Sequence, residues 1–172
     1  YLNLEYLGIL VDKEKDIVKQ SPLNDVKVRK AINYAFDRKK MMRYLRNNIG
    51  EPALSGVIPK GLPSFSGPSI GYTYDPEKAK QLLIEAGFSN SKPKITITTN
   101  AEYLDLCRYI QFQLNEVGFD ASIDVNPAAA LRELKAQTKL NFFRASWIAD
   151  YPDGENYLSM FYSKNFAPNG PN

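Results

Sequence analysis

The stretch that decides the fold is NFFRASWIADYPDGENYLSMFYS, residues Asn141–Ser163. Its first part is apolar and aromatic, interrupted by Arg144, and predicts a buried strand. A polar turn with Asp150 and Asp153 follows, together with a proline and a glycine that end the strand. Beyond the turn, apolar side chains recur at the spacing of a short amphipathic helix: Tyr157, Leu158, Phe161 and Tyr162. A strand that ends in a polar turn before a helix is where open α/β sheets bind ligands.

The turn has a structural and a functional interpretation. In the structural one, Asp150 shapes the turn and Asp153 caps the following helix, because short carboxylates accept hydrogen bonds from free backbone amides. In the functional one, Asp150 belongs to a ligand site at the end of the strand. The local pattern alone favours the structural interpretation.

Three segments carry a family resemblance. The first follows the pattern W-x-A-D-Y-P-D-x-E-N-x-L and comprises Trp147, Ala149, Asp150, Tyr151, Pro152, Asp153, Glu155, Asn156 and Leu158. The second, residues 22–38, resembles P-L-x-D-x-R-V-R-x-A-I-x-Y-A-x-D-R, and the third spans residues 74–83 with Ala86 and Gly87. On these residues the chain resembles the bacterial extracellular solute-binding proteins of the peptide/nickel type, the oligopeptide- and dipeptide-binding components of ABC importers. It departs at Gly154, where the family more often has a second proline.

The resemblance implies a fold and a set of partners. Family members are longer, two-lobed clamshells, so residues 1–172 are expected to form a single C-terminal lobe with a mixed, mostly parallel sheet flanked by helices. The implied partners are a peptide ligand, the N-terminal lobe of the same protein and a membrane-embedded ABC permease. The resemblance further implies a monomer that resides in the periplasm or on the cell surface as a lipoprotein.

The resemblance also implies the site residues. Asp150 matches the aspartate that pairs with the α-ammonium of a peptide ligand. Arg144 matches an arginine that meets the ligand's C-terminal carboxylate in some oligopeptide binders. Trp147 and Tyr151 are expected to form a wall of a side-chain pocket, and a core position for Trp147 is an equal alternative. No catalytic residue, metal or cofactor is expected.

Periodicity supports an α/β lobe independently of the resemblance. Strands are predicted at residues 1–11, around Ile95 and Ile97, at 121–125 and at 140–147. Helices are predicted from an Asn24 cap to Phe36, from Asp37 to before Gly50, at 75–87, at 104–117 and from Asn126-Pro127 onward. Because strands alternate with helices in the second half, neighbouring strands are expected to be parallel.

Two segments of the first half have open interpretations. Residues 48–74 are rich in glycine and proline yet carry apolar side chains, which predicts a long packed loop that either lines a cleft or only covers the surface. The charged residues 13–21 are expected to be a connector. A basic cluster suggests phosphate binding, but it lies opposite an apolar stripe and is better interpreted as a solvated face: Arg38, Lys39, Lys40, Arg43 and Arg46.

Composition excludes several classes of function. The chain has 22 basic and 19 acidic residues, so its net charge of +3 is too small for a nucleic-acid groove or a membrane-binding face. A single cysteine and the absence of histidine exclude disulfides, Cys-His nucleophile pairs and histidine metal sites. Asp150 with Asp153 as a carboxylate acid/base pair is the enzymatic alternative. A ligand-sensing domain of a transcription regulator, or a binder of a nickel complex or sugar, would keep the same fold.

Overall fold

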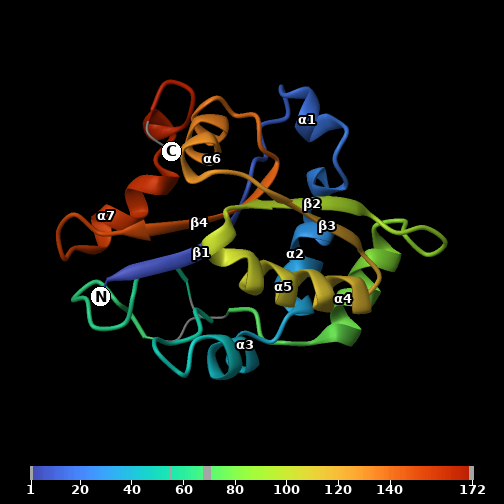
Figure 1. Cartoon of the computed structure of the whole chain (residues 1–172), viewed down its shortest axis with the longest axis horizontal. Helices are drawn as coiled ribbons and strands as arrows, with labels where there is room; N and C mark the ends of the chain where they lie inside the picture. The colour runs from blue at the N-terminus through green and yellow to red at the C-terminus, as the bar shows by residue number, and fades with distance from the viewer. Residues whose placement is uncertain (1, 55, 68–70, 171–172) are drawn as a thin grey trace.

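The computed structural model describes residues 2–54, 56–67 and 71–170 (Figure 1). A four-stranded sheet in the order β1-β4-β2-β3 crosses the middle of the molecule. Its strands are β1 (Asn3–Ile9), β2 (Lys94–Thr99), β3 (Asp120–Val125) and β4 (Phe142–Ile148). β2 is parallel to both β3 and β4, whereas β1 is antiparallel to β4. The predicted α/β class with a mixed, mostly parallel sheet is therefore confirmed.

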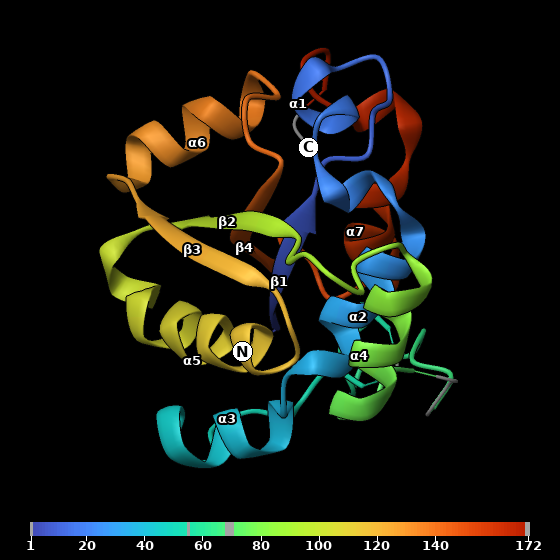
Figure 2. The same cartoon turned by 90° about the vertical axis from the view of Figure 1, so that its right-hand side faces the viewer.

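Helices cover both faces of the sheet. They are α1 (Asp16–Lys19), α2 (Val26–Ala35), α3 (Arg38–Leu45), α4 (Pro76–Glu85), α5 (Leu104–Glu116), α6 (Ala128–Ala136) and α7 (Gly154–Leu158). Short 3₁₀ segments occupy Pro22–Asn24, Ala101–Tyr103, Ser159–Phe161 and Ser163–Asn165. α2, α4 and α5 lie below the sheet in Figure 1 and α6 lies above it. Figure 2 shows α5 and α6 on opposite sides of the β2–β3 pair.

The main core lies between the sheet and α2, α4 and α5. The apolar side of α2 is buried, and its side chains belong to one cluster with Ile97 of β2 and Phe142 of β4. Leu114 and Cys107 of α5 are fully buried in the same cluster, so Cys107 is a small core residue. Burial of these side chains is the principal stabilising contribution, at about 25 cal/mol per Å² of apolar surface.

A second, smaller core anchors α7 and the long loop. Leu4, Leu62 and Tyr157 are buried together, with Val57, Ile58 and Trp147 packed against them. The Tyr157 hydroxyl donates to the backbone carbonyl of Leu2 at 2.7 Å. The described residues between positions 48 and 74 contain no helix or strand, so the prediction of a long loop held by its own apolar side chains is confirmed.

Two predicted helix caps are wrong. α2 is capped by Asp25, whose Oδ1 accepts from the Lys27 amide at 2.6 Å, because Asn24 ends a preceding 3₁₀ segment. α6 begins at Ala128 without a side-chain cap. The Asn126 amide instead donates to Asp124 Oδ2 at 2.7 Å, so it braces the end of β3. In contrast, Asp37 and Asp75 cap α3 and α4 as expected.

Three element boundaries also differ from expectation. β1 covers residues 3–9 rather than 1–11, and Tyr1 lies outside the described residues. The connector at 13–21 contains the single helical turn α1, because this turn places Val18 in a completely buried position. β4 begins at Phe142 rather than Leu140, since Asn141 uses its backbone carbonyl and side chain to bind Leu10.

Gly154 has a packing role that the sequence did not reveal. It is buried at the start of α7, and a Cβ atom there would lie 2.6 Å from Ser64 Cβ and 3.2 Å from Ile58 Cδ1. A side chain at this position would therefore push the long loop away from α7.

We predict that Gly154→Ala lowers the free energy of unfolding by about 1–3 kcal/mol, because overpacking forces backbone shifts. Chemical denaturation monitored by circular dichroism measures the loss. The double variant Gly154→Ala/Ser64→Gly removes the clashing atoms and should recover part of it. An equal loss in both variants would contradict the steric explanation.

Candidate functional site

The carboxyl ends of the three parallel strands meet at one edge of the sheet (left in Figure 1). After β2 the chain turns to α5 on one face, and after the neighbouring β3 it turns to α6 on the other (Figure 2). Open α/β sheets bind ligands at such a switch point. An open hollow of ≈ 380 Å³ lies here, lined by residues 100–102 and 125–128.

Asp150 follows this edge directly, in the turn after β4. Its side chain is exposed and makes no hydrogen bond or ion pair with any described residue. Asp150 therefore lies just past the C-terminal end of β4 and is exposed to solvent, and its ligand role stays a prediction. Asp153 caps α7, its Oδ1 accepting from the Glu155 amide at 2.8 Å, so the structural interpretation holds for that carboxylate.

Arg144 lies deeper in the molecule, in the middle of β4. Its side chain is only 11% exposed, and its guanidinium carbon stands 3.0 Å from the ring centre of Tyr103. Nη2 lies 3.5 Å from Glu5 Oε1, too far for a well-formed charge-assisted hydrogen bond. Within residues 2–54, 56–67 and 71–170, neither Nε nor Nη2 has a hydrogen-bond partner. A buried guanidinium with open donors is a feature expected of an anion site.

The charge of Arg144 acts on the residues around it. Burial raises the pKa of the Tyr6 hydroxyl, and the nearby Arg144 charge lowers it again in part. Burial lowers the pKa of the Lys135 ammonium, and repulsion from Arg144 and Arg132 adds to the effect. Lys135 lies on α6 and Tyr6 on β1, so the positive field of Arg144 reaches both neighbouring elements.

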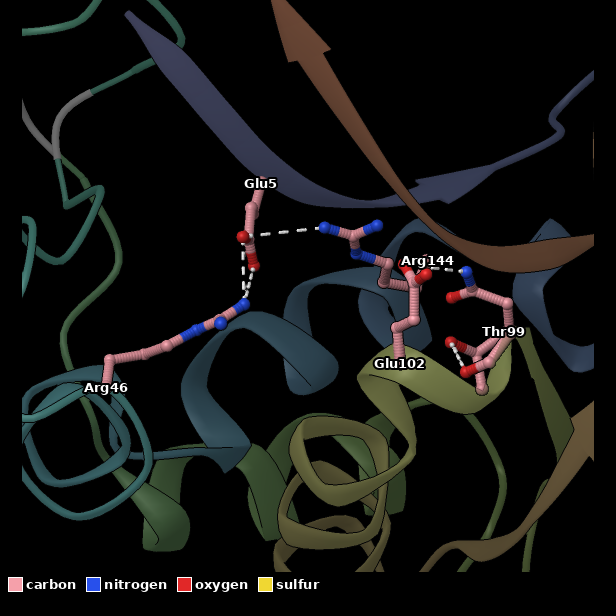
Figure 3. A network of polar contacts seen from close by, with 6 residues as sticks. Glu5, Arg46, Thr99, Glu102 and Arg144 are labelled. Atoms are coloured by element: carbon pink, nitrogen blue, oxygen red, sulfur yellow. Dashed lines mark hydrogen bonds and ion pairs between the residues drawn. The ribbon is translucent and has the colours of Figure 1, made fainter. Parts of the chain in front are cut away.

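Glu5 and Arg46 complete a charged cluster that sequence reasoning missed (Figure 3). Nη2 of Arg46 donates to both Glu5 oxygens, at 2.8 and 2.7 Å. Each of these two side chains is 33% exposed. Glu5 lies on the same face of β1 as Leu7, which pairs with Arg144. A charged residue in an otherwise apolar strand was the one local signal, because Arg46 is 41 residues away in sequence.

Asn100 contributes a second unsatisfied group at this edge. Its Nδ2 donates weakly to Glu102 Oε2 at 3.4 Å, while Oδ1 is buried without a partner among the described residues. Exchanging the amide atoms would place two oxygens against each other, so this orientation is the favourable one. Asn100, which lines the hollow beside β2, therefore carries a buried acceptor that no described residue satisfies.

Trp147 and Tyr151 do not share a wall with Arg144. Trp147 is three positions further along β4, so the alternation of the strand sends it to the opposite face of the sheet. There it packs in the second core and donates from Nε1 to Asn156 Oδ1 at 2.7 Å. Tyr151 is 47% exposed in the turn, with its hydroxyl 3.4 Å from Glu155 Oε2. Both pocket roles remain predictions.

Other kinds of site were sought in the part of the chain that the structure describes. No group of three or more Cys, Asp or Glu side chains there is arranged to hold a metal ion. None of the described helices has the length and apolar character required to cross a bilayer.

The fold and the polar edge define the class of the protein. The mixed α/β chain, with Asp150 exposed at the carboxyl edge of its sheet, has the periplasmic-binding-protein fold. The family model described as bacterial extracellular solute-binding proteins, family 5 Middle, matches residues 1–169. The chain belongs to this family.

Individual relatives agree with the family assignment. The glutathione-binding protein GsiB of Escherichia coli strain K12 is 32% identical over 167 residues, covering 88% of this chain and 31% of GsiB. Heme-binding protein A of Haemophilus influenzae is 29% identical over 165 residues, covering 92% of this chain and 28% of that protein. The solved structure of the periplasmic binding protein DppA from Helicobacter pylori, in complex with peptide STSA, superposes with a TM-score of 0.79 at 26% identity and covers 91% of this chain and 29% of that one. The chain thus spans about a third of the length of these relatives.

We predict that the Trp147–Asn156 hydrogen bond holds the turn that carries Asp150. Asn156 is 4% exposed, so Asn156→Ala should lower the free energy of unfolding by about 1–3 kcal/mol, because it leaves the indole N–H unpaired. In a Trp147→Phe background, Asn156→Ala should lower the free energy of unfolding much less, because the indole N–H donor is already absent. Denaturant titration of the four proteins measures the coupling, and additive losses would contradict a direct interaction.

Proposed function

We propose that the protein containing this chain captures short peptides for an ABC importer, in a cleft closed by a second lobe. The observation that carries the proposal is the unpaired Asp150 carboxylate at the carboxyl edge of β4. A peptide's α-ammonium, once removed from water by lobe closure, requires such an acceptor, and a charge-assisted hydrogen bond contributes about 1.5–3 kcal/mol.

A second charge, on Arg144 within β4, supports the same ligand class. Arg144 has open donors and a guanidinium shape that suits a carboxylate. Arg144 and Ile148, the last residue of β4, are four strand steps apart, which corresponds to about 13 Å, so an extended peptide of several residues would reach from Arg144 to the turn that carries Asp150. The peptide STSA in the Helicobacter pylori relative and the tripeptide glutathione named for GsiB belong to this class.

Partners, location and activity are proposed from the family membership. The chain is proposed to form the C-terminal lobe of a monomeric, periplasmic or lipid-anchored protein that delivers its ligand to a membrane-embedded permease. Binding without chemical conversion is the activity that this family membership favours. A cysteine within a lipobox at the start of the full-length sequence would support the lipoprotein assignment.

In the full-length protein, Asp150→Ala is expected to weaken binding of peptides with a free N-terminus at least about tenfold, or 1.4 kcal/mol. N-acetylated peptides should bind the parent poorly and lose little more on mutation, because the interaction needs a charged amine. Isothermal titration calorimetry with matched free and acetylated tripeptides compares the two losses.

Asp153→Ala is the matched control, since it removes a carboxylate of the same turn that caps α7. It should reduce stability without discriminating between free and acetylated peptides. Equal losses for both peptides in Asp150→Ala would show that Asp150 supports the turn rather than the ligand.

We further expect the 172-residue chain to fold by itself but to bind peptides weakly or not at all. Its main core draws on α2, α4, α5 and three of its strands, which favours independent folding. A solvent-exposed ammonium–carboxylate pair contributes only about 0–1 kcal/mol, less than the several kcal/mol needed to immobilise a peptide.

Trp147 is the single tryptophan, so its fluorescence reports both properties. Denaturation should show one cooperative transition, and titration with a mixed tripeptide pool should show no saturation below millimolar concentration. Saturable micromolar binding would mean that one lobe is sufficient, contrary to the proposed clamshell.

A further inference from the structure

Two guanidinium groups compete for one carboxylate beside β1. Arg46 Nη2 lies 2.8 and 2.7 Å from the two Glu5 oxygens, with hydrogen-bond geometry to both. Arg144 Nη2 lies 3.5 Å from Oε1 of the same carboxylate and makes no hydrogen bond to it. Arg46 therefore holds Glu5 more closely than Arg144 does, and the three side chains together carry one net positive charge.

The two arginines lie in different environments. The side chains of Arg46 and Glu5 are one third exposed to solvent. The Arg144 side chain is only 11% exposed and is stacked on the Tyr103 ring. Figure 3 shows both guanidinium groups directed at the Glu5 carboxylate, each from a different side. A carboxylate in this position would bind the buried guanidinium if nothing else held it, because an unpaired buried charge is costly.

We propose that Arg46 is a positioning residue that holds the Glu5 carboxylate and thereby keeps Arg144 open for an anionic group of the ligand. Glu5 is the internal competitor of that group. The inference rests on the proposed function for the nature of the anion, a peptide carboxylate. The competition between Glu5 and the two arginines depends only on contacts within this chain.

The mechanism predicts that the effects of two substitutions depend on one another. Arg46→Met keeps the apolar stem but releases Glu5, which then pairs with Arg144 and should reduce the affinity for Ala-Ala-Ala about tenfold. Glu5→Gln removes the competing charge and should raise the affinity a few-fold. In the double variant Glu5→Gln/Arg46→Met, the loss caused by Arg46→Met should disappear.

Two controls separate this mechanism from long-range attraction. Arg43→Met removes an equal charge from the exposed side of α3 without touching Glu5, so it should leave the affinity within about twofold. Ala-Ala-Ala-amide lacks the C-terminal charge and should respond to none of these substitutions. The inference is wrong if Arg46→Met lowers the affinity equally in the parent and in the Glu5→Gln background. It is also wrong if Arg46→Met lowers the affinities for Ala-Ala-Ala and Ala-Ala-Ala-amide equally.

A second measurement is independent of peptide binding. In full-length protein labelled with ¹⁵N in arginine, the Nη–H signals of Arg144 are assigned by their disappearance in Arg144→Lys. Hydrogen exchange of the Nη2 protons, which lie nearest Glu5, should be slower in Arg46→Met than in the parent, because Glu5 then accepts from Nη2. Sodium acetate should slow the exchange in the parent and much less in Arg46→Met.

The two measurements distinguish failure of the inference from failure of the proposed function. Slowed exchange in Arg46→Met without binding of any tripeptide would support the Glu5 competition and contradict peptide capture. Tripeptide binding that depends on Asp150, with Arg144 exchange unchanged in Arg46→Met, would support peptide capture and overturn the role of Arg46.

Discussion

The pairing of β1 with β4 is the constraint on which the site depends. β4 is an interior strand, and its register with β1 sets Leu7 opposite Arg144 and Glu5 opposite Ser146. Because side chains alternate, Arg144 and Glu5 share the face covered by α2 and α5, while Trp147 faces the second core. A slip of one residue would exchange the two faces and bury the guanidinium among Leu4 and Tyr157.

Placing an arginine in an interior strand has an energetic cost that the surroundings reduce only in part. Tyr103 offers the face of its ring to the guanidinium, an interaction worth about 2 kcal/mol when desolvated. Glu5 supplies a counter-charge, yet at 3.5 Å and already bound to Arg46 it does not satisfy the donors. A position that is stable but incompletely satisfied is typical of functional sites, where binding of a ligand completes the set of partners.

The sequence predicted what depends on local chemistry and missed what depends on distant segments. α4 was predicted from cap to stop because Asp75, Pro76 and Gly87 act within a few residues of one another. Asp150 was placed correctly, since a strand followed by a polar turn is a local pattern. Its ligand role comes from the family resemblance and is a proposal.

The errors have a common physical cause. Asn24 was expected to cap α2, but it belongs to a 3₁₀ segment, and Asp25 caps α2 instead. The sequence left both a pocket and a core position open for Trp147. Its indole N–H binds Asn156, which comes close only because the turn after β4 brings α7 back against the strand. Glu5 and Arg46 meet only after the sheet has formed, so no local pattern revealed their contact.

The two charges of the candidate site are supported in different ways. Arg144 is fixed by β4 itself, whereas Asp150 lies in a turn that the Asp153 cap, the Asn156–Trp147 bond and the buried Gly154 hold against the long loop. The long loop therefore helps to hold the turn of Asp150, although the two segments are far apart in sequence. Under the proposed function, a site with one end on a strand and the other on a braced turn would keep its spacing while the ligand arrives, so that closure of a second lobe would have to supply only the remaining contacts and the exclusion of water.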